Sequence, residues 1–455
     1  MVETLEIPHR VHIVGAGGAG MSGVAKLLSQ LGHEVSGSDL KPGRMLDTLS
    51  DVGVTTWIGH RPDALTGVEL MVASSAVPDS DPELAVAPSV GALVWRRPEL
   101  LKRLTSGRRT LGFAGTHGKT TSTALAVTAL RGSGHDPSFL VGGEMVGLNT
   151  GASLGTDGLM LLEADEAFGT FRHLELDSVV VTNIEADHLD HYGSVAALED
   201  AFAQVASRVP GVTIGCIDDV GIRRLAQRTE LTTYGFSAEA DYRITDLAHE
   251  AGGVMFTLRG PNGVVAVQLP KPGEHLASNA AGVLALLDVN GFDLAASAAA
   301  LEGFSGVRRR YEIKAFVGGV TIVDDYAHHP TEVAATIAAA SYGTSGRVIA
   351  VFQPHRYTRT ADLGPDFGAP LALADLVIVT DIYPAGERPL IGVSGRLVAE
   401  ATEAAGGNVR YAQRLGEVAA LVAADATEDD VVLLMGAGDV NSIAGDVARL
   451  IESKR

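Results

Sequence analysis

Residues 110–121 read TLGFAGTHGKTT, and this stretch sets the architecture of the chain. Thr110–Ala114 is a short apolar run that predicts a buried strand, and Thr120–Leu130 predicts a helix. Gly-Lys-Thr at 118–120, between strand and helix, is typical of a phosphate-binding loop. The strict pattern has a glycine where this chain has Phe113, so the loop is a variant.

The chemistry of this loop follows from its residue types. Successive backbone N–H groups form a nest for phosphate oxygens. Lys119 would reach the β- and γ-phosphates, and the Thr120 hydroxyl would bind Mg²⁺. The alternative is a turn with a surface lysine, which the flanking strand and helix disfavour. We therefore expect the phosphates of a nucleotide, which the family resemblance described below identifies as ATP, to bind through Gly115, Thr116, His117, Gly118, Lys119, Thr120 and Thr121.

A second glycine loop lies nearer the N-terminus. Val11–Val14 predicts a strand, Met21–Leu31 a helix and His33–Ser36 a second strand. The intervening sequence fits G-x-G-x-x-G, and Asp39 has about the spacing at which an acid binds a ribose hydroxyl. A nucleotide diphosphate is the expected ligand, held by Gly15, Gly17, Gly18, Gly20 and Asp39. The motif leaves open a nicotinamide dinucleotide, and also tight strand–helix packing without a ligand.

Further alternation of strands and helices predicts three α/β domains. Arg347–Phe352, Asp375–Thr380 and Asp430–Met435 are expected strands of the third domain. Val254–Arg259 and Val264–Leu269 flank Pro-Asn-Gly, which predicts a hairpin. We expect a Rossmann-like domain at 1–107, a central P-loop ATPase-like domain at 108–307 with a mainly parallel sheet plus antiparallel strands, and a Rossmann-like domain at 308–455.

Carboxylates and a histidine follow two central strands. Glu163 ends the strand 159–163, and His188 lies in the loop after the strand 179–182. Ligands of open α/β sheets collect at the carboxyl ends of strands, so Glu163 and His188 could converge on one metal ion. Oxygen ligands with one imidazole suit Mg²⁺ or Mn²⁺ better than Zn²⁺. For His191, a few residues further on, the sequence favours neither a functional role nor a place in a solvated loop without one.

Two more polar segments follow expected strands of the third domain. Residues 324–332 carry a dense run of ionisable groups, of which Thr331 and Glu332 are candidates for helix capping only. Residues 353–359 place Arg356 and Arg359 after a strand, where they offer two guanidinium groups to an anion.

Composition narrows the possible partners. The 455 residues carry a net charge of −20, which argues against nucleic acid as a partner. The single cysteine, Cys216, excludes an intramolecular disulfide and is expected to be a buried apolar side chain. The N-terminus is acidic where a signal peptide would be basic, and no apolar run is long enough to cross a membrane. We expect a cytoplasmic protein.

The order of these motifs resembles the Mur ligase family over nearly the whole chain. DDYAHHPTEV and FQPHRYTRT are similar to the member that adds L-alanine to UDP-N-acetylmuramate. The resemblance implies an ATP-dependent ligase of peptidoglycan synthesis that acts through an acyl phosphate. It rests on VHIVGAGGAGMSG (11–23), SGSD (36–39), AGTHGKTT (114–121), EADE (163–166), TNIEADHLDHYG (182–193), DDYAHHPTEV (324–333), FQPHRYTRT (352–360), DIYPAGE (381–387) and GAGD (436–439).

The resemblance also assigns residues. The first domain would hold the UDP part of the sugar nucleotide, and two Mg²⁺ ions, replaceable by Mn²⁺, would bind at Thr120, Glu163 and His188. Asn279 would contact adenine, and Arg310 would reach the phosphates. The catalytic residues would be Lys119, His328, Arg356 and Arg359, with Tyr326 beside them at the amino acid and acyl groups.

One departure from the family stands out. Several relatives carry a carbamoylated lysine after the DHLD segment, whereas this chain has no lysine between His188 and Lys271. The second metal would therefore be held otherwise.

Three alternatives stay open beside the alanine-adding ligase. They are a peptide-recycling ligase of the same family, a nicotinamide-dependent dehydrogenase and an ATP-gated binding protein. The expected partners are UDP-N-acetylmuramate and L-alanine, without nucleic acid or membrane, and the expected state is a monomer or weak homodimer.

Overall fold

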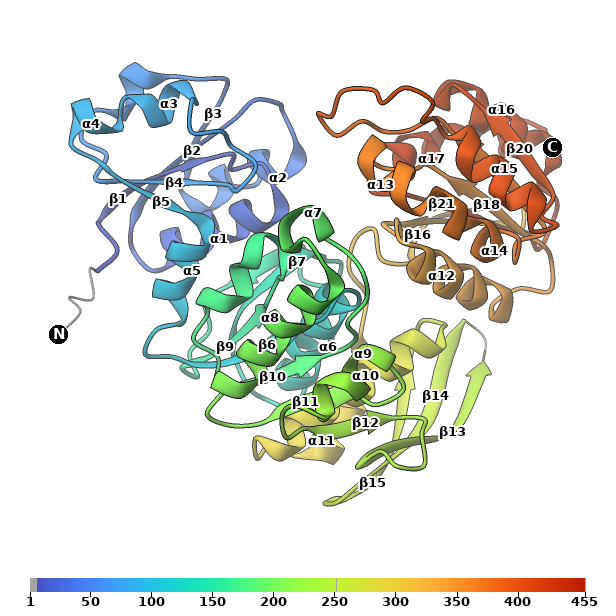
Figure 1. Ribbon diagram of the computed structural model, residues 1–455, viewed down its shortest axis with the longest axis horizontal. Helices are drawn as coiled ribbons and strands as arrows, with labels where there is room; N and C mark the ends of the chain where they lie inside the picture. The colour runs from blue at the N-terminus through green and yellow to red at the C-terminus, as the bar shows by residue number, and fades with distance from the viewer. Residues whose placement is uncertain (1–5, 251, 455) are drawn as a thin grey trace. The chain divides into compact units, whose positions relative to one another are not determined.

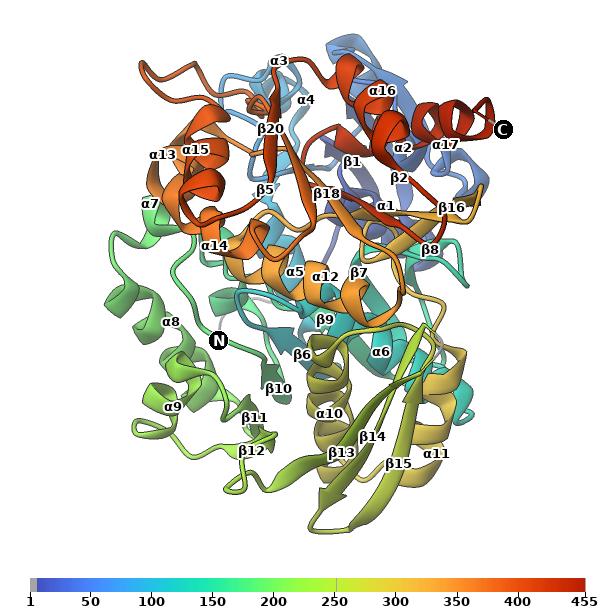
Figure 2. The ribbon, with the colours of Figure 1, turned by 90° about the vertical axis from the view of Figure 1, so that its right-hand side faces the viewer.

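The computed structural model describes residues 6–250 and 252–454, which form α/β layers around three sheets (Figure 1 and Figure 2). The first sheet is entirely parallel, in the order β3-β2-β1-β4-β5. Its strands are β1 (Arg10–Val14), β2 (Glu34–Asp39), β3 (Thr55–Ile58), β4 (Leu70–Ala73) and β5 (Leu93–Arg96). Its helices are α1 (Ala19–Gln30), α2 (Arg44–Asp47), α3 (Pro82–Ala85), α4 (Ala87–Val90) and α5 (Arg97–Thr105).

The central sheet has the order β15-β14-β13-β12-β11-β10-β6-β9-β7-β8. The pairs from β13 to β7 are parallel, and β8 adds an antiparallel edge. Its strands are β6 (Arg109–Ala114), β7 (Ser138–Met145), β8 (Thr150–Ser153), β9 (Leu159–Glu163), β10 (Ser178–Val181), β11 (Thr213–Cys216), β12 (Thr232–Gly235), β13 (Tyr242–Glu250), β14 (Gly253–Gly260) and β15 (Gly263–Leu269). Its helices are α6 (Lys119–Gly132), α7 (Leu189–Tyr192), α8 (Val195–Arg208), α9 (Val220–Ala226), α10 (Glu274–Val289) and α11 (Leu294–Ala300).

The third sheet has the order β16-β17-β21-β18-β19-β20, in which only β16 is antiparallel to its neighbour. Its strands are β16 (Glu312–Val317), β17 (Val320–Asp325), β18 (Val348–Phe352), β19 (Leu376–Thr380), β20 (Val409–Ala412) and β21 (Val431–Met435). Its helices are α12 (Pro330–Tyr342), α13 (Tyr357–Leu363), α14 (Gly368–Leu371), α15 (Arg396–Ala404), α16 (Leu415–Asp425) and α17 (Ala444–Glu452).

Alternate side chains of the third sheet serve two separate cores. Ile349 and Val351 pack with α16 and α17, whereas Val348, Ala350 and Phe352 pack with α12, α14 and α15. Successive side chains of a strand point to opposite faces, so a strand buried on both faces is apolar throughout. This explains why β18 reads as a continuous apolar run.

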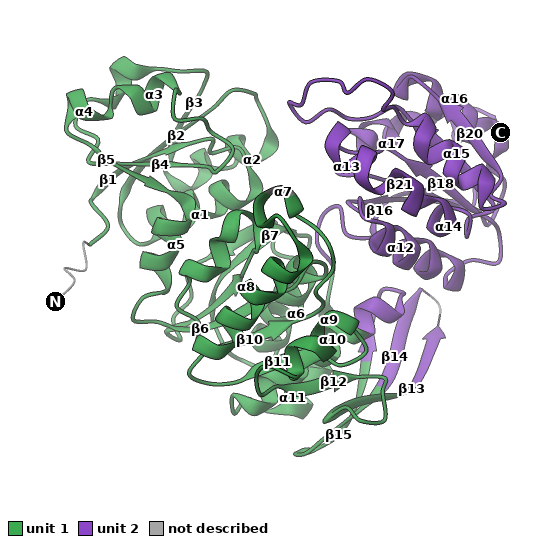
Figure 3. Ribbon diagram, viewed as in Figure 1, with its two compact units in different colours: residues 1–245, 257–267, 278–305 green, residues 246–256, 268–277, 306–455 purple. Residues whose placement is uncertain are grey.

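The chain divides into two compact units (Figure 3). Unit 1 comprises residues 1–245, 257–267 and 278–305, and unit 2 comprises 246–256, 268–277 and 306–455. Within unit 1, helix α1 of the first sheet packs closely on the central sheet. A Cβ at Gly23 would lie 2.5 Å from Leu140 Cδ1, so a larger residue would have to displace the Leu140 side chain. The first and central sheets thus share one apolar core.

The expected α/β class with three sheets is confirmed. Strand β2 runs to Asp39, past the expected end at Ser36, because Gly37 and Ser38 continue the pairing with β1. The expected hairpin is present as β14 and β15, and Cys216 is buried. In the described part of the chain, no helix is long and apolar enough to cross a membrane. The domain boundaries expected near 107 and 307 stay predictions.

Candidate active site

The phosphate loop connects the end of β6 to the start of α6. Gly115 has φ +127°, and a Cβ there would lie 2.1 Å from Thr182 Oγ1, so the position requires glycine. Asn183 fixes the loop, since its backbone oxygen accepts from Thr116 N and its side-chain oxygen from His117 N. The amides of the first turn of α6 therefore remain as the donors that helix geometry leaves for a phosphate.

Lys119 lies buried inside this loop. Its Nζ donates to Gly115 O at 2.7 Å and to both carboxylate oxygens of Glu166, at 2.9 and 2.8 Å. Burial alone would lower the pKa of the ammonium, but Glu166, Asp165 and Glu163 outweigh it and raise the pKa above its usual value. Lys119 therefore stays charged. Glu166 is the partner that the sequence reasoning missed, although it stands in the same EADE segment as Glu163.

Thr120 and Glu163, expected as metal ligands, lie together. Thr120 Oγ1 donates to Glu163 Oε2 at 2.9 Å, and Gly142 N donates to the same oxygen at 2.7 Å. The carboxylate thus stands between the first turn of α6 and strand β7. A hydroxyl and a carboxylate oxygen in contact are a donor set that suits Mg²⁺.

His188, the other expected metal ligand, lies beside two other carboxylates, those of Asp187 and Glu166. Its Nε2 lies 3.8 Å from Asp187 Oδ2 and 4.0 Å from Glu166 Oε1. Its backbone is left-handed, with φ +53°, which is uncommon outside glycine. Glu166 therefore connects His188 with Lys119, while Glu163 connects with Thr120. The structure brings two of the expected ligands, Thr120 and Glu163, into contact, and places the third, His188, beside Glu166.

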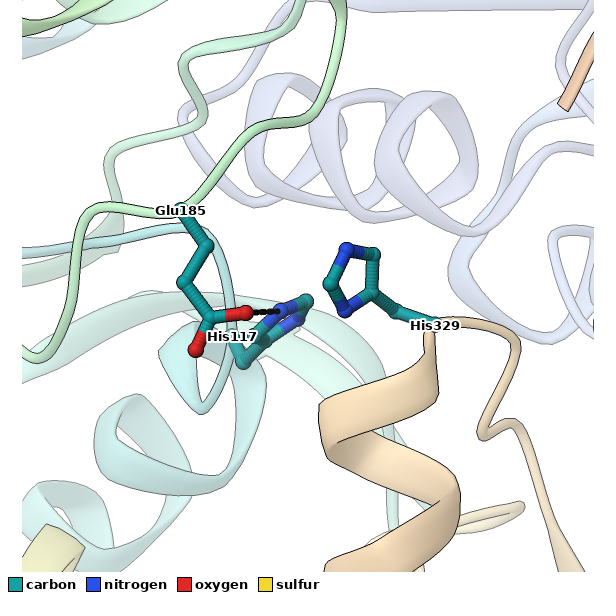
Figure 4. Close-up of side chains that lie close together, drawn as sticks. All are labelled: His117, Glu185 and His329. Atoms are coloured by element: carbon teal, nitrogen blue, oxygen red, sulfur yellow. Dashed lines mark ion pairs between the residues drawn. The ribbon is translucent and has the colours of Figure 1, made fainter. Parts of the chain in front are cut away.

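His117 of the loop forms an ion pair with Glu185. Their Nε2 and Oε2 atoms are 3.5 Å apart. Figure 4 marks this pair with a dashed line. Thr116 reinforces the contact, since its hydroxyl oxygen accepts from Glu185 N at 2.9 Å. His329, drawn in the same figure, belongs to unit 2, where its side chain accepts a hydrogen bond from Thr331 N at the start of α12. Glu185 is a further residue that the sequence reasoning did not select.

Two other expected ATP residues lie on helices of unit 1. Asn279 is buried on α10, and its side chain approaches the loop so closely that a Cβ at Gly118 would meet Asn279 Oδ1 at 2.6 Å. Gly118 itself has φ +83°, which favours glycine. Thr121 follows Thr120 in the first turn of α6. The structure therefore places the Asn279 side chain beside the phosphate loop. A residue that contacts the bound nucleotide would have to lie near this loop.

The first glycine loop is fixed by the end of strand β2. Gly15 N and Ala16 N donate to Ser38 O, at 2.9 and 2.8 Å. Gly17 N donates to Asp39 Oδ2 at 2.9 Å, and a Cβ at Gly17 would lie 2.8 Å from that oxygen. The structure thus brings the expected pair Gly17 and Asp39 together.

The same loop borders an arginine that the sequence reasoning missed. Gly18 caps α1, and Gly20 follows in its first turn. A Cβ at Gly20 would lie 2.9 Å from Arg97 Nη2. Arg97 Nε is buried and has no hydrogen-bond partner among the residues that the structure describes. A guanidinium beside a glycine loop supplies the positive charge that a diphosphate requires. Strand-end position would have pointed to Arg97, which directly follows β5.

In unit 2, the segment after β17 is tightly connected. His328 Nδ1 lies 2.9 Å from Tyr326 O and 3.3 Å from Glu332 Oε2. Arg310 Nη1 lies 3.8 Å from Glu332, and its guanidinium stands over the Tyr326 ring at 5.1 Å. Glu332 therefore does more than cap a helix, because it connects His328 with Arg310.

Arg356 and Arg359 lie at the start of α13. Arg356 precedes the helix with φ +69°, and its Nε donates to Glu387 Oε1 at 2.6 Å. Arg359 is half-buried in the first turn. Burial, together with the charges of His328, Arg359 and Arg356, lowers the pKa of neighbouring His355 to about 4. The cluster is cationic, which suits binding of a carboxylate.

Three family models match successive ranges of the chain, one for each of the three sheets. Residues 10–109 match the family described as Mur ligase family, catalytic domain, residues 113–287 match the Mur ligase middle domain, and residues 309–438 match the Mur ligase, glutamate ligase domain. The chain is 42% identical to the UDP-N-acetylmuramate–L-alanine ligase of Mycolicibacterium vanbaalenii, over 98% of this chain and 97% of that protein. It is also 42% identical to the same-named ligase of Acidothermus cellulolyticus, over 98% of this chain and 94% of the relative.

A solved structure agrees. The crystal structure of UDP-N-acetylmuramate–alanine ligase from Thermotoga maritima superposes with a TM-score of 0.84 at 26% identity, over 98% of this chain and 100% of that chain. The murein peptide ligase of Psychrobacter arcticus shares the fold, with a TM-score of 0.70 at 23% identity, over 98% of this chain and 99% of that chain. With three matching family domains and close relatives over nearly its full length, the chain belongs to the Mur ligase family.

Proposed function

We propose that this chain is an ATP-dependent ligase that joins L-alanine to the carboxylate of UDP-N-acetylmuramate in peptidoglycan synthesis. The products are UDP-N-acetylmuramoyl-L-alanine, ADP and phosphate. The chain is 42% identical to two UDP-N-acetylmuramate–L-alanine ligases, and the similarity covers almost the entire length of both chains. The observation that carries the proposal is the loop at the end of β6, where buried Lys119 and the contact between Thr120 and Glu163 meet.

The chemistry begins with activation of a carboxylate, because an amine cannot displace its oxygen at neutral pH. The muramoyl carboxylate oxygen attacks the γ-phosphorus of ATP, the bond to the β–γ bridging oxygen breaks, and ADP leaves. Lys119, held charged by its carboxylate neighbours, neutralises the phosphoryl oxygens in this step. The amides at the start of α6 position the phosphates.

Magnesium would add charge neutralisation on the phosphates when bound. Thr120 would hold one ion, and we propose that Glu163 and His188 contribute to a second, without a carbamoylated lysine; Mn²⁺ would substitute for Mg²⁺. His117, Thr116 and Thr121 shape the loop around the nucleotide. We propose that Asn279 contacts adenine and that Arg310 reaches the phosphates.

The second step forms the amide. The neutral amine of L-alanine attacks the acyl phosphate carbon, a proton leaves the nitrogen, and the tetrahedral intermediate expels phosphate. Arg356 and Arg359 bind the alanine carboxylate in this proposal, with His328 and Tyr326 beside the acyl group. The cationic surroundings of His355 support the assignment.

We propose that each of the three parts of the chain binds a different substrate. Residues 1–107 hold the UDP part through the glycine loop, with Asp39 on one side and Arg97 on the other. Residues 108–307 bind ATP, and residues 308–455 bind the amino acid and close over the site. In this proposal the protein acts in the cytoplasm, as a monomer or weak homodimer.

Phosphate release from ATP, measured across a matrix of sugar nucleotides and amino acids, tests the proposal. We expect release only when UDP-N-acetylmuramate and L-alanine are both present. Release with an intact peptide in place of L-alanine would favour the recycling ligase instead. ATP binding without any substrate-dependent turnover would favour an ATP-gated binding protein, and tight NADH binding would favour a dehydrogenase.

A further inference from the structure

Phe168 has a backbone conformation that its side chain does not explain. Its φ is +54° and its ψ is 21°, in the left-handed region that bulky residues rarely adopt. Its ring is 60% exposed, so burial does not offset the strain. Non-glycine residues held in this region cost free energy and cluster at ligand sites. The exposed and strained ring therefore needs a reason other than packing.

The loop around Phe168 is held firmly. Glu166 O accepts hydrogen bonds from Gly169 N at 2.8 Å and from the Tyr192 hydroxyl at 2.6 Å. The His191 ring stands edge-on to Phe168, with 6.2 Å between ring centroids, and edge-on to Tyr192 at 4.8 Å. Phe168, in the 3-10 segment Ala167–His173 after β9, and His191, in helix α7 after β10, thus form one exposed aromatic pair.

This pair is connected to the phosphate loop through Glu166. Phe168 is two residues from Glu166, whose carboxylate holds Lys119 of the phosphate loop. In the proposed reaction, the acyl carboxylate must meet the γ-phosphoryl group at that lysine. A short lactyl ether joins this carboxylate to the pyranose ring, so the sugar must lie within a few bonds of the Lys119–Glu166 pair.

Resting on the proposed function, we propose that Phe168 and His191 form an aromatic contact for the sugar ring of UDP-N-acetylmuramate. A pyranose presents a face of C–H groups, which packs on the face or edge of an aromatic ring as other apolar surfaces do. The left-handed backbone at Phe168 keeps the ring outside the core and available to the substrate. His191 limits the orientations of the ring.

Calorimetry on the full chain, with UDP and UDP-N-acetylmuramate as separate ligands, tests the contact. Phe168→Gly removes the ring and suits the left-handed backbone. We expect the Kd for UDP-N-acetylmuramate to rise about tenfold while the Kd for UDP stays unchanged, since UDP has no sugar to contact the ring. The Tm should stay equal or rise, because strain is relieved. Phe168→Tyr, which keeps the ring, should bind like wild type.

A matched control variant relieves a left-handed backbone strain at a position in unit 2. Asp429 is exposed with φ +70° in unit 2, and Asp429→Gly should change neither Kd. An unchanged Kd for the sugar nucleotide in Phe168→Gly would overturn the inference. So would equal weakening of both ligands together with a lower Tm, which indicates a structural role. Failure of the proposed function is distinct, because wild type would then release no phosphate with UDP-N-acetylmuramate and L-alanine.

Discussion

Lys119 and Glu166 form a buried ion pair, in which Nζ lies 2.8 Å from one carboxylate oxygen and 2.9 Å from the other. The Glu166 side chain is only 1% exposed and that of Lys119 is 11% exposed. The lysine of the phosphate loop therefore has two roles. It supplies charge to the nucleotide, and it neutralises a carboxylate that would otherwise be buried alone.

Lys119→Ala should abolish most ligation and also weaken the fold. Loss of transition-state charge neutralisation lowers kcat by at least about 10²-fold. Burial already raises the pKa of Glu166 to about 7, and loss of Lys119 should raise it further, so the free energy of unfolding should fall by up to about 3–5 kcal/mol only at pH values where Glu166 stays charged. Phosphate release and urea unfolding measure the two effects.

The double variant Lys119→Ala/Glu166→Gln separates these roles. It should recover much of the stability, because the buried charge is gone, but none of the ligation. Near wild-type turnover in either variant would show that the reaction does not need Lys119.

Glu163→Gln should weaken metal binding more than ATP binding. The substitution keeps the size of the side chain but removes the charge that faces Thr120. Turnover should then require a higher Mg²⁺ or Mn²⁺ concentration, and excess metal should rescue it only in part. Glu175→Gln, at an exposed position, serves as control. Identical metal titrations of Glu163→Gln and wild type would show that Glu163 is not a ligand.

Arg97→Ala should weaken UDP binding without loss of fold. Arg97 borders Gly20, and losing a charge-assisted hydrogen bond to the diphosphate costs roughly 1.5–3 kcal/mol, or about 10- to 150-fold in Kd. Calorimetry with UDP gives the Kd directly.

The neighbouring arginine is the matched control. Arg96 donates to Ser74 O and Val77 O, so Arg96→Ala should chiefly lower the Tm. If Arg97→Ala lowers the Tm by as much and leaves the Kd for UDP unchanged, Arg97 has a structural role only.

Arg359→Lys should raise the KM for L-alanine by about 10- to 150-fold, because an ammonium cannot reproduce two parallel hydrogen bonds to a carboxylate. The KM values for ATP and the sugar nucleotide should change little. Ethylamine, which lacks the carboxylate, should be a poor substrate for wild type and no worse for the variant. Steady-state kinetics with both amines checks this.

Arg356 requires its own comparison, because it is bonded to Glu387. Arg356→Lys should raise the KM for L-alanine if the guanidinium also reaches the substrate. Glu387→Gln should alter it less, since the arginine stays in place. Unchanged KM values in both Arg356→Lys and Arg359→Lys would contradict the carboxylate clamp.

Local sequence determined the strand–loop–helix units. At Gly17 and Gly118, glycine is favoured by close approach or by a positive φ, and the glycine patterns of the sequence predict both loops. Strand β18 was evident as a continuous apolar run because both of its faces are buried. The placement of Asp39 at the end of β2 followed from its spacing to the first loop. These features depend on neighbours in the chain, which a sequence displays directly.

Tertiary structure alone decided which side chains meet across strands. Glu166 binds Lys119, His188 lies 4.0 Å from Glu166, and Arg97 borders Gly20. These pairings depend on strand order, register and the path of loops, and a shift of one residue would exchange the faces. Spacing along the chain predicts that charged groups gather at one sheet edge, but packing over long separations selects the partner of each charge.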